Sequence, residues 1–102
     1  MGIELGEPLD PARYLAGDFE TQKELLDDAW ASGDPAYLAH AIGTVARARG
    51  GIAKLAADTG LQRQALHKAL GPNGNPRLAT LMKVFAALKV RPRMEDASAD
   101  AA

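Results

Sequence analysis

The sequence predicts an all-α protein of five to six helices, in which two short helices joined by a glycine turn follow a helical N-terminal extension. The apolar residues make up 47% of the chain and only 5% of the residues are aromatic. Alanine-rich sequence that is poor in β-branched residues favours helices. Apolar residues also recur at helical spacing, and Asp-Pro and Gly-Gly pairs separate these stretches where helices commonly begin and end.

The first third of the chain is expected to hold a short helical turn and then a longer helix. Asp10 and Asp34 each precede a proline, so each is placed to cap a helix whose first residue needs no N–H. Asp18 is expected to cap a helix over residues 19–32, which Gly33 ends. The predicted inward face of that helix consists of Phe19, Leu26, Ala29 and Trp30.

Three further helices are predicted before a central loop. Residues 35–49 form one, because apolar side chains recur at helical spacing and a Gly-Gly pair follows. Residues 52–58 and 62–70 form two short helices, joined through Thr59-Gly60, where glycine can adopt the positive φ that turns the chain. Two short helices joined in this way form the helix-turn-helix unit, which sets its second helix in the major groove of DNA.

The last part of the chain is predicted to contain a loop, a helix and a tail. Residues 71–76 are rich in Gly, Pro and Asn and form the loop. Residues 78–88 are apolar except at Thr80 and Lys83, so this helix is expected to be buried on most sides. The tail contains Pro92 and is expected to be extended, as an edge strand or a dimer arm, with residues 97–102 disordered.

Charge is strongly segregated along the chain, although the net charge is only −1. Residues 1–40 hold nine acids and two bases, whereas residues 41–94 hold ten bases and a single acid, Asp58. The basic part could face phosphate, and the acidic part would then face solvent or a basic partner. We therefore divide the chain into an acidic helical extension (1–40), a DNA-binding unit (41–90) and a tail (91–102).

The second short helix carries the candidate DNA-reading residues on one face. At about 100° per residue, its core face is predicted to be formed by two alanines and two leucines: Ala65, Leu66, Ala69 and Leu70. Arg63 suits guanine and Gln64 suits adenine, so these two are expected to read bases. The expected phosphate or additional base contacts are Gln62 at the helix N-cap, His67, Lys68, Lys54 and Arg77.

Other classes of function find little support in the sequence. The chain has no cysteine, and His40 and His67 lack the partners that a zinc site needs. Asp27 and Asp28 diverge on a helix and have no accompanying nucleophile, so we predict no enzyme, no metal and no cofactor. No apolar run is long enough for a signal peptide or membrane span, and the expected location is the cytoplasm.

Two sets of residues resemble known families. The stretches Leu55-Ala56, Thr59-Gly60-Leu61, Asn75-Pro76 and Thr80-Leu81, with Leu66 and Leu70, resemble the Xre/Cro-type helix-turn-helix domain, which implies a lambda-repressor-like fold. The stretches Leu9-Asp10-Pro11-Ala12, Gly33-Asp34-Pro35 and Ala46-Arg47-Ala48-Arg49-Gly50, with Tyr14-Leu15, resemble the probable addiction-module antidote proteins, which are HigA-like antitoxins.

The resemblance implies a function and partners. Proteins of this kind bind a small basic toxin of the RelE/ParE superfamily and repress their own operon as homodimers on double-stranded DNA. By position, Arg63, Gln64 and Lys68 fall where Xre-type domains read bases, while Gln62 replaces the Ser or Thr that usually caps the recognition helix. Two alternatives stay open: a stand-alone phage-like repressor without a toxin, and a protein-interaction module that no longer binds DNA.

Overall fold

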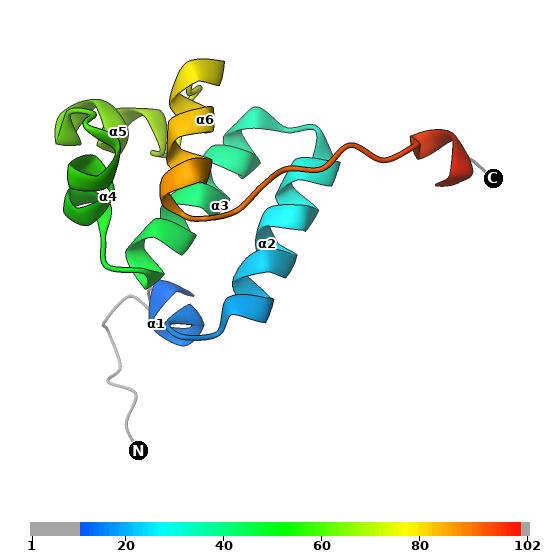
Figure 1. Ribbon diagram of the computed structural model, residues 1–102, viewed down its shortest axis with the longest axis horizontal. Helices are drawn as coiled ribbons and strands as arrows, with labels where there is room; N and C mark the ends of the chain where they lie inside the picture. Colours follow the sequence, from blue (N-terminus) through cyan, green and yellow to red (C-terminus); the bar gives the residue numbers. More distant parts are fainter. Residues whose placement is uncertain (1–10, 101–102) are drawn as a thin grey trace.

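The computed structural model describes residues 11–100, and within them the chain forms six α-helices and one short 3-10 helix (Figure 1). The bounds of the α-helices are α1 Pro11–Leu15, α2 Phe19–Ser32, α3 Pro35–Ala48, α4 Ile52–Thr59, α5 Arg63–Ala69 and α6 Leu78–Ala87. The 3-10 helix η1 spans Ala97–Asp100. This described part is all-α, as the sequence predicts, and its helix bounds agree with the predicted ones to within a residue or two.

Aspartate side chains begin α2 and α3 as predicted. The Asp18 carboxylate accepts hydrogen bonds from the Thr21 backbone N–H at 3.1 Å and the Thr21 hydroxyl at 2.8 Å. These two bonds stabilise the charged carboxylate and lower the pKa of Asp18, so their contribution to stability is lost as the pH falls through that lowered pKa. Asp34 accepts from the Ala36 N–H at 3.0 Å. Asp10, the third predicted cap, lies outside the described residues.

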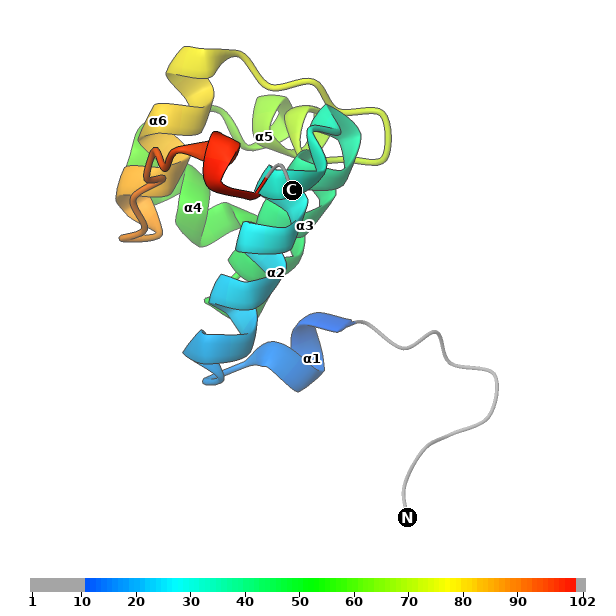
Figure 2. The ribbon, with the colours of Figure 1, turned by 90° about the vertical axis from the view of Figure 1, so that its right-hand side faces the viewer.

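The core gathers around α3, which lies between α2 on one side and the α4–α5 pair on the other (Figures 1 and 2). Ile42 and Val45 of α3 and Val84 of α6 are fully buried, and Leu26 and Ala29 of α2 pack into the same cluster. Phe19 and Trp30, however, are 62% and 44% exposed. Their predicted place in the core was wrong because α2 is covered along one narrow stripe only.

The last helix and the tail also depart from the prediction in part. Leu78 and Met82 are exposed, so α6 is buried on one side rather than on most sides. The side that is covered holds Val84, Phe85 and Leu88. Residues 91–96 have no regular structure, but Ala97–Asp100 form a helical turn where disorder was predicted. That turn begins at Asp96, whose carboxylate accepts from the Ser98 N–H at 2.9 Å and the Ser98 hydroxyl at 2.6 Å.

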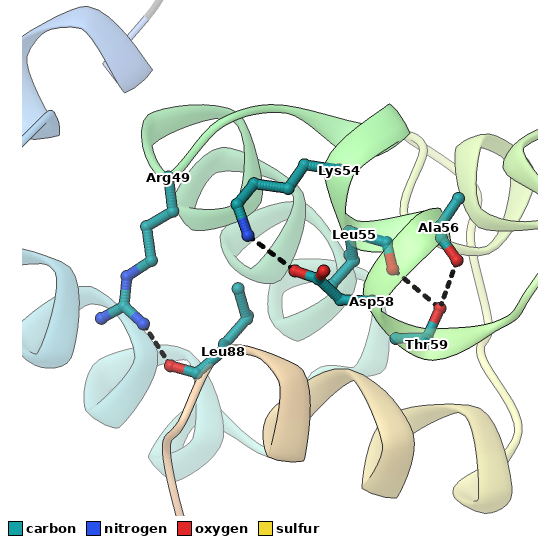
Figure 3. Close-up of polar contacts among 7 residues, drawn as sticks. All are labelled: Arg49, Lys54, Leu55, Ala56, Asp58, Thr59 and Leu88. Carbon is teal, nitrogen blue, oxygen red and sulfur yellow. Dashed lines mark hydrogen bonds and ion pairs between the residues drawn. The ribbon is translucent and has the colours of Figure 1, made fainter.

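One arginine connects the acidic extension to the rest of the protein. The Arg49 Nε donates to Oε1 of Gln22 at 2.6 Å, and its guanidinium also donates to the Leu88 carbonyl oxygen at the end of α6 (Figure 3). Gln22 is fully buried and donates in turn to the Leu15 carbonyl oxygen at 2.6 Å. The Phe19 ring lies 5.2 Å from the guanidinium carbon. This cluster ties α1, α2, the end of α3 and the end of α6 together.

Candidate nucleic-acid interface

A tight turn joins α4 to α5. Gly60 adopts the left-handed conformation that commonly ends a helix, with φ 75° and ψ 9°. Its N–H donates to the Ala56 carbonyl oxygen at 2.9 Å. The Thr59 hydroxyl donates to the Leu55 carbonyl oxygen at 2.8 Å (Figure 3). The same hydroxyl oxygen accepts from the Leu61 N–H at 3.2 Å. The predicted role of Gly60 is confirmed, and Thr59 adds a side-chain connection across the turn.

Leu66 anchors α5 to the core. This side chain is 1% exposed, and Ala56 and Leu61 are partly buried against the same cluster. At the end of α5, Leu70 packs against α3 at Gly43, where an added Cβ would lie 3.0 Å from the Leu70 carbonyl oxygen. Gly43 went unnoticed in the sequence, although a single glycine inside a helical pattern commonly marks such a close approach.

The outer face of α5 carries the predicted DNA-reading residues. All five of its predicted contact residues are exposed, and none of their side chains makes a hydrogen bond or ion pair within the described part of the chain: Gln62, Arg63, Gln64, His67 and Lys68. Ala65 is exposed as well, so its predicted place on the core face was wrong. The short α5 is covered along Leu66 and Leu70, which leaves its remaining sides free to meet a partner.

The beginning of α5 lacks a side-chain cap. Gln62 has the extended backbone of an N-cap residue, with φ −72° and ψ 137°, but its side chain accepts no hydrogen bond from the helix. Its carbonyl oxygen accepts the first helical bond, from the Leu66 N–H at 3.0 Å. Gln62 therefore occupies the N-cap position without the side-chain hydrogen bond that Ser or Thr commonly makes there.

The two predicted flanking residues lie in different surroundings. Lys54 is exposed on α4, where its Nζ forms an ion pair with the Asp58 carboxylate at 2.7 Å (Figure 3). Both side chains border a pocket that Arg49 and Leu88 also line, away from α5. Arg77 is exposed at the start of α6 and makes no side-chain cap bond. Of these two flanking residues, only Arg77 has a side chain without an ion-pair or hydrogen-bond partner within the described residues.

The part of the chain that contains α5 is rich in basic residues. The sequence contains no acidic residue between Asp58 and Glu95, whereas seven lysines and arginines fall in that interval. The exposed bases nearest α5 in the chain are Arg63 and Lys68 on the helix itself and Arg77 after the loop. Exposed cations without an ion-pair partner attract phosphate over distances of about 10 Å at ordinary salt.

The opposite side of the molecule is acidic. Glu20, Glu24 and Asp27 recur at helical spacing along the exposed face of α2. Asp27 pairs with Lys23 at 3.3 Å, while Glu20 and Glu24 have no ionic partner among residues 11–100. Tyr14 on the adjoining α1 is 62% exposed. Unpaired carboxylates along an exposed helix face are the kind of surface that a basic protein can bind.

A metal centre finds no support in the described residues. No group of three or more His, Cys, Asp or Glu side chains gathers there in a way that could hold an ion. No helix in this part of the chain is long and apolar enough to cross a membrane. The feature that stands out among the described residues is the exposed outer face of α5, which follows α4 after a tight turn at Gly60.

Comparison with known proteins gives the family. A family model described as a probable addiction module antidote protein matches residues 6–96. An uncharacterized protein of Haemophilus influenzae is 37% identical over 82 residues, which cover 80% of this chain and 82% of that protein. No solved structure matches. The match spans nearly all of the described helices, and the chain belongs to the family of probable addiction module antidote proteins.

Proposed function

We propose that this protein is the antitoxin of a type II toxin-antitoxin module, which neutralises a toxin by direct binding and represses its own operon as a DNA-binding dimer. The observation that carries the DNA-binding part is the outer face of α5, where five exposed polar or cationic side chains make no hydrogen bond or ion pair within the described residues. The membership of an antidote family supports the toxin-binding part.

In the proposed complex, α5 enters the major groove of the operator. Arg63 and Gln64, in the first turn of α5, read base edges, because a guanidinium matches guanine O6 and N7 and an amide matches adenine N6 and N7. Gln62, His67, Lys68 and Arg77 contact phosphates or neighbouring bases. Two copies of α5, one from each protomer, occupy successive major grooves roughly 34 Å apart.

Arg63→Ala is expected to relax sequence specificity. Losing one bidentate base contact removes about 1–3 kcal/mol of discrimination, or roughly five- to 150-fold. A matched variant, Arg77→Ala, removes a phosphate contact and should weaken binding to operator and scrambled DNA alike, with a shallower salt dependence. Lys54→Ala should act in the same way but less, because Asp58 already pairs with this lysine.

Mobility-shift titrations of these variants on operator and scrambled duplexes make the comparison. The change for Arg63→Ala should fall mainly on the operator. Equal losses on both duplexes would assign Arg63 to phosphate instead of to bases.

The toxin partner is proposed to be a small basic protein of the RelE/ParE superfamily that binds the acidic face of α2. Glu20 and Glu24 provide unpaired negative charge there. Opposite potentials speed association and favour the correct partner. This face and α5 lie on different sides of α3, so one protomer could hold toxin and DNA at the same time (Figure 1).

Glu24→Lys is expected to weaken binding of the toxin encoded beside this gene. The charge reversal opposes a basic partner, and association should slow by about tenfold at low salt and less at high salt. Asp58→Lys is the matched control, because it makes the same change of charge on α4, on the other side of the molecule. The association rates of both variants with the immobilised toxin are compared, and only Glu24→Lys is expected to associate more slowly. Equal slowing would mean that only net charge matters, and the toxin site would then lie elsewhere.

A second candidate function, a protein-interaction module that no longer binds DNA, is favoured by the uncapped start of α5. Mobility shifts at low and moderate salt distinguish the two. Binding that disappears with salt and shows no sequence preference would support the module. A stand-alone repressor is the outcome if operator binding is specific and no toxin gene lies beside this one.

A further inference from the structure

The outer side of α6 carries an apolar groove that the protein leaves open. The groove has a volume of about 600 Å³ and is lined mainly by the apolar residues Met82, Phe85, Val90 and Pro92. Met82 is 65% exposed. Trp30 of α2 packs edge-on against the Phe85 ring, with centroids 6.1 Å apart, and keeps 44% of its own surface exposed. Large apolar side chains exposed together mark an interaction surface.

The chain leaves this groove as an arm, which we define as residues 91–98: residues 91–96 have no regular structure, and the last two residues begin η1. Lys89 has a left-handed φ of 58°. Its N–H donates to the Ala86 carbonyl oxygen at 3.1 Å, and the Val90 N–H donates to the Phe85 carbonyl oxygen at 3.0 Å. This paired bond pattern ends α6 and turns the chain sharply. Every residue of the arm is exposed, and the arm runs past α2 and away from the helices (Figure 1). Met94 is 93% exposed.

The order of charges along the arm points to the partner. Arg91 and Arg93 come first, and Glu95 and Asp96 follow. The Ser98 hydroxyl and N–H stabilise the charged Asp96 carboxylate and lower its pKa. A basic partner would be repelled by the two arginines, and DNA by the two carboxylates. A second arm in the antiparallel direction places carboxylates opposite arginines in both copies, so the pattern is complementary to itself.

We propose that α6 and the arm form the dimer interface of this protein, with the arm of each protomer lying antiparallel to the arm of its partner and covering the Met82–Phe85 groove of the other copy. In this register Arg93 faces Glu95 of the partner subunit, and the exposed Met94 lies on the two-fold axis against Met94 of the partner subunit. The proposal rests on the proposed function in one respect, since that function needs two copies of α5. It can nevertheless be tested without DNA or toxin.

Sedimentation equilibrium of the full-length protein, over a range of concentrations, is the test. The wild type is expected to form dimers. Met82→Glu places a carboxylate in the groove and should raise the dimer Kd by at least about tenfold. Tyr14→Glu is the matched control, because Tyr14 is similarly exposed at 62% but lies on α1, away from the groove. Circular dichroism and thermal melting check that both variants remain folded.

Charge exchange along the arm makes the test specific for a second copy. Arg93→Glu alone and Glu95→Arg alone should each weaken the dimer, because each variant opposes like charges across the two-fold axis. The double variant Arg93→Glu with Glu95→Arg should restore the dimer. A wild-type protein that stays monomeric, a Tyr14→Glu variant as weak as Met82→Glu, or a double variant no better than the single ones would overturn the proposal.

These outcomes are independent of DNA binding. A dimer of the expected kind that fails to bind its operator would leave this interface standing and refute the proposed repressor. A monomer whose groove is instead required for binding the toxin would assign the groove to the toxin, and would overturn the proposal of a second copy.

Discussion

Arg49→Leu is expected to lower the free energy of unfolding by about 2–4 kcal/mol, because two hydrogen bonds of a charged group are lost and buried acceptors are left without donors. The acceptors are Oε1 of Gln22, which is fully buried, and the Leu88 carbonyl oxygen. The loss should also loosen α2 against the ends of α3 and α6, since Arg49 contacts all three. Chemical denaturation measures the change.

Two variants control this prediction. Arg13→Leu removes an exposed arginine of α1 and should change stability by less than about 0.5 kcal/mol. Arg49→Lys keeps the charge but lacks the planar fork that reaches two acceptors, so its stability should fall between the other two. If Arg49→Leu unfolds at the same denaturant concentration as Arg13→Leu, then Arg49 does not connect the acidic extension to the DNA-binding unit.

Leu66→Ala is expected to lower the free energy of unfolding by about 2–5 kcal/mol, the range for truncating a leucine in a core. Leu66 is 1% exposed and is the main apolar contact of the short helix α5. A domain of this size has a total stability of roughly 5–15 kcal/mol, so the melting temperature should fall by roughly 10 °C or more. Calorimetry gives both quantities.

Leu78→Ala is the control for this truncation, because the same atoms are removed from a leucine that is 71% exposed on α6. Its stability should stay within about 0.5 kcal/mol of the wild type. Hydrogen exchange adds a local measurement: amide protection in α5 should fall more in Leu66→Ala than protection in α3. Uniform loss over both helices would mean that α5 and the core unfold as one unit.

Helix positions could be predicted well because the signals that begin and end these helices are local. Asp18 and Asp34 cap through their own side chains, and Gly33 and Gly60 end helices with positive φ values of 72° and 75°. None of these interactions depends on distant parts of the chain. The helix bounds therefore followed from residues within one turn of each end.

Burial could be predicted only where the apolar stripe was unambiguous. Leu26, Leu66 and Leu70 are buried as expected, whereas Phe19, Trp30 and Ala65 are exposed. A helical wheel identifies the apolar side of a helix but does not tell how many neighbours cover it. Leu78 and Met82 lie on the side of α6 that no other described helix covers, which sequence periodicity alone could not reveal.

The candidate site divides in the same way. The exposed face of α5 followed from its spacing relative to Leu66 and Leu70, so Arg63 and Gln64 lie at the surface as predicted. The ion pair of Lys54 with Asp58 joins residues i and i+4 of one helix, a spacing at which opposite charges commonly pair, so the sequence does indicate this contact. The contacts of Arg49 with Gln22 and Leu88 join residues 27 and 39 positions apart, and no local pattern indicates them.

The central claim is that α5 reads a specific DNA sequence, and a mobility shift of the purified protein on its own upstream DNA tests it most directly. The titration is done at about 150 mM salt, where nonspecific phosphate contacts are weakened, with scrambled duplex as competitor. Sequence-specific reading by α5 predicts a complex that resists the scrambled competitor and is lost to unlabelled upstream DNA. A folded protein that binds neither duplex, or both equally, would contradict it.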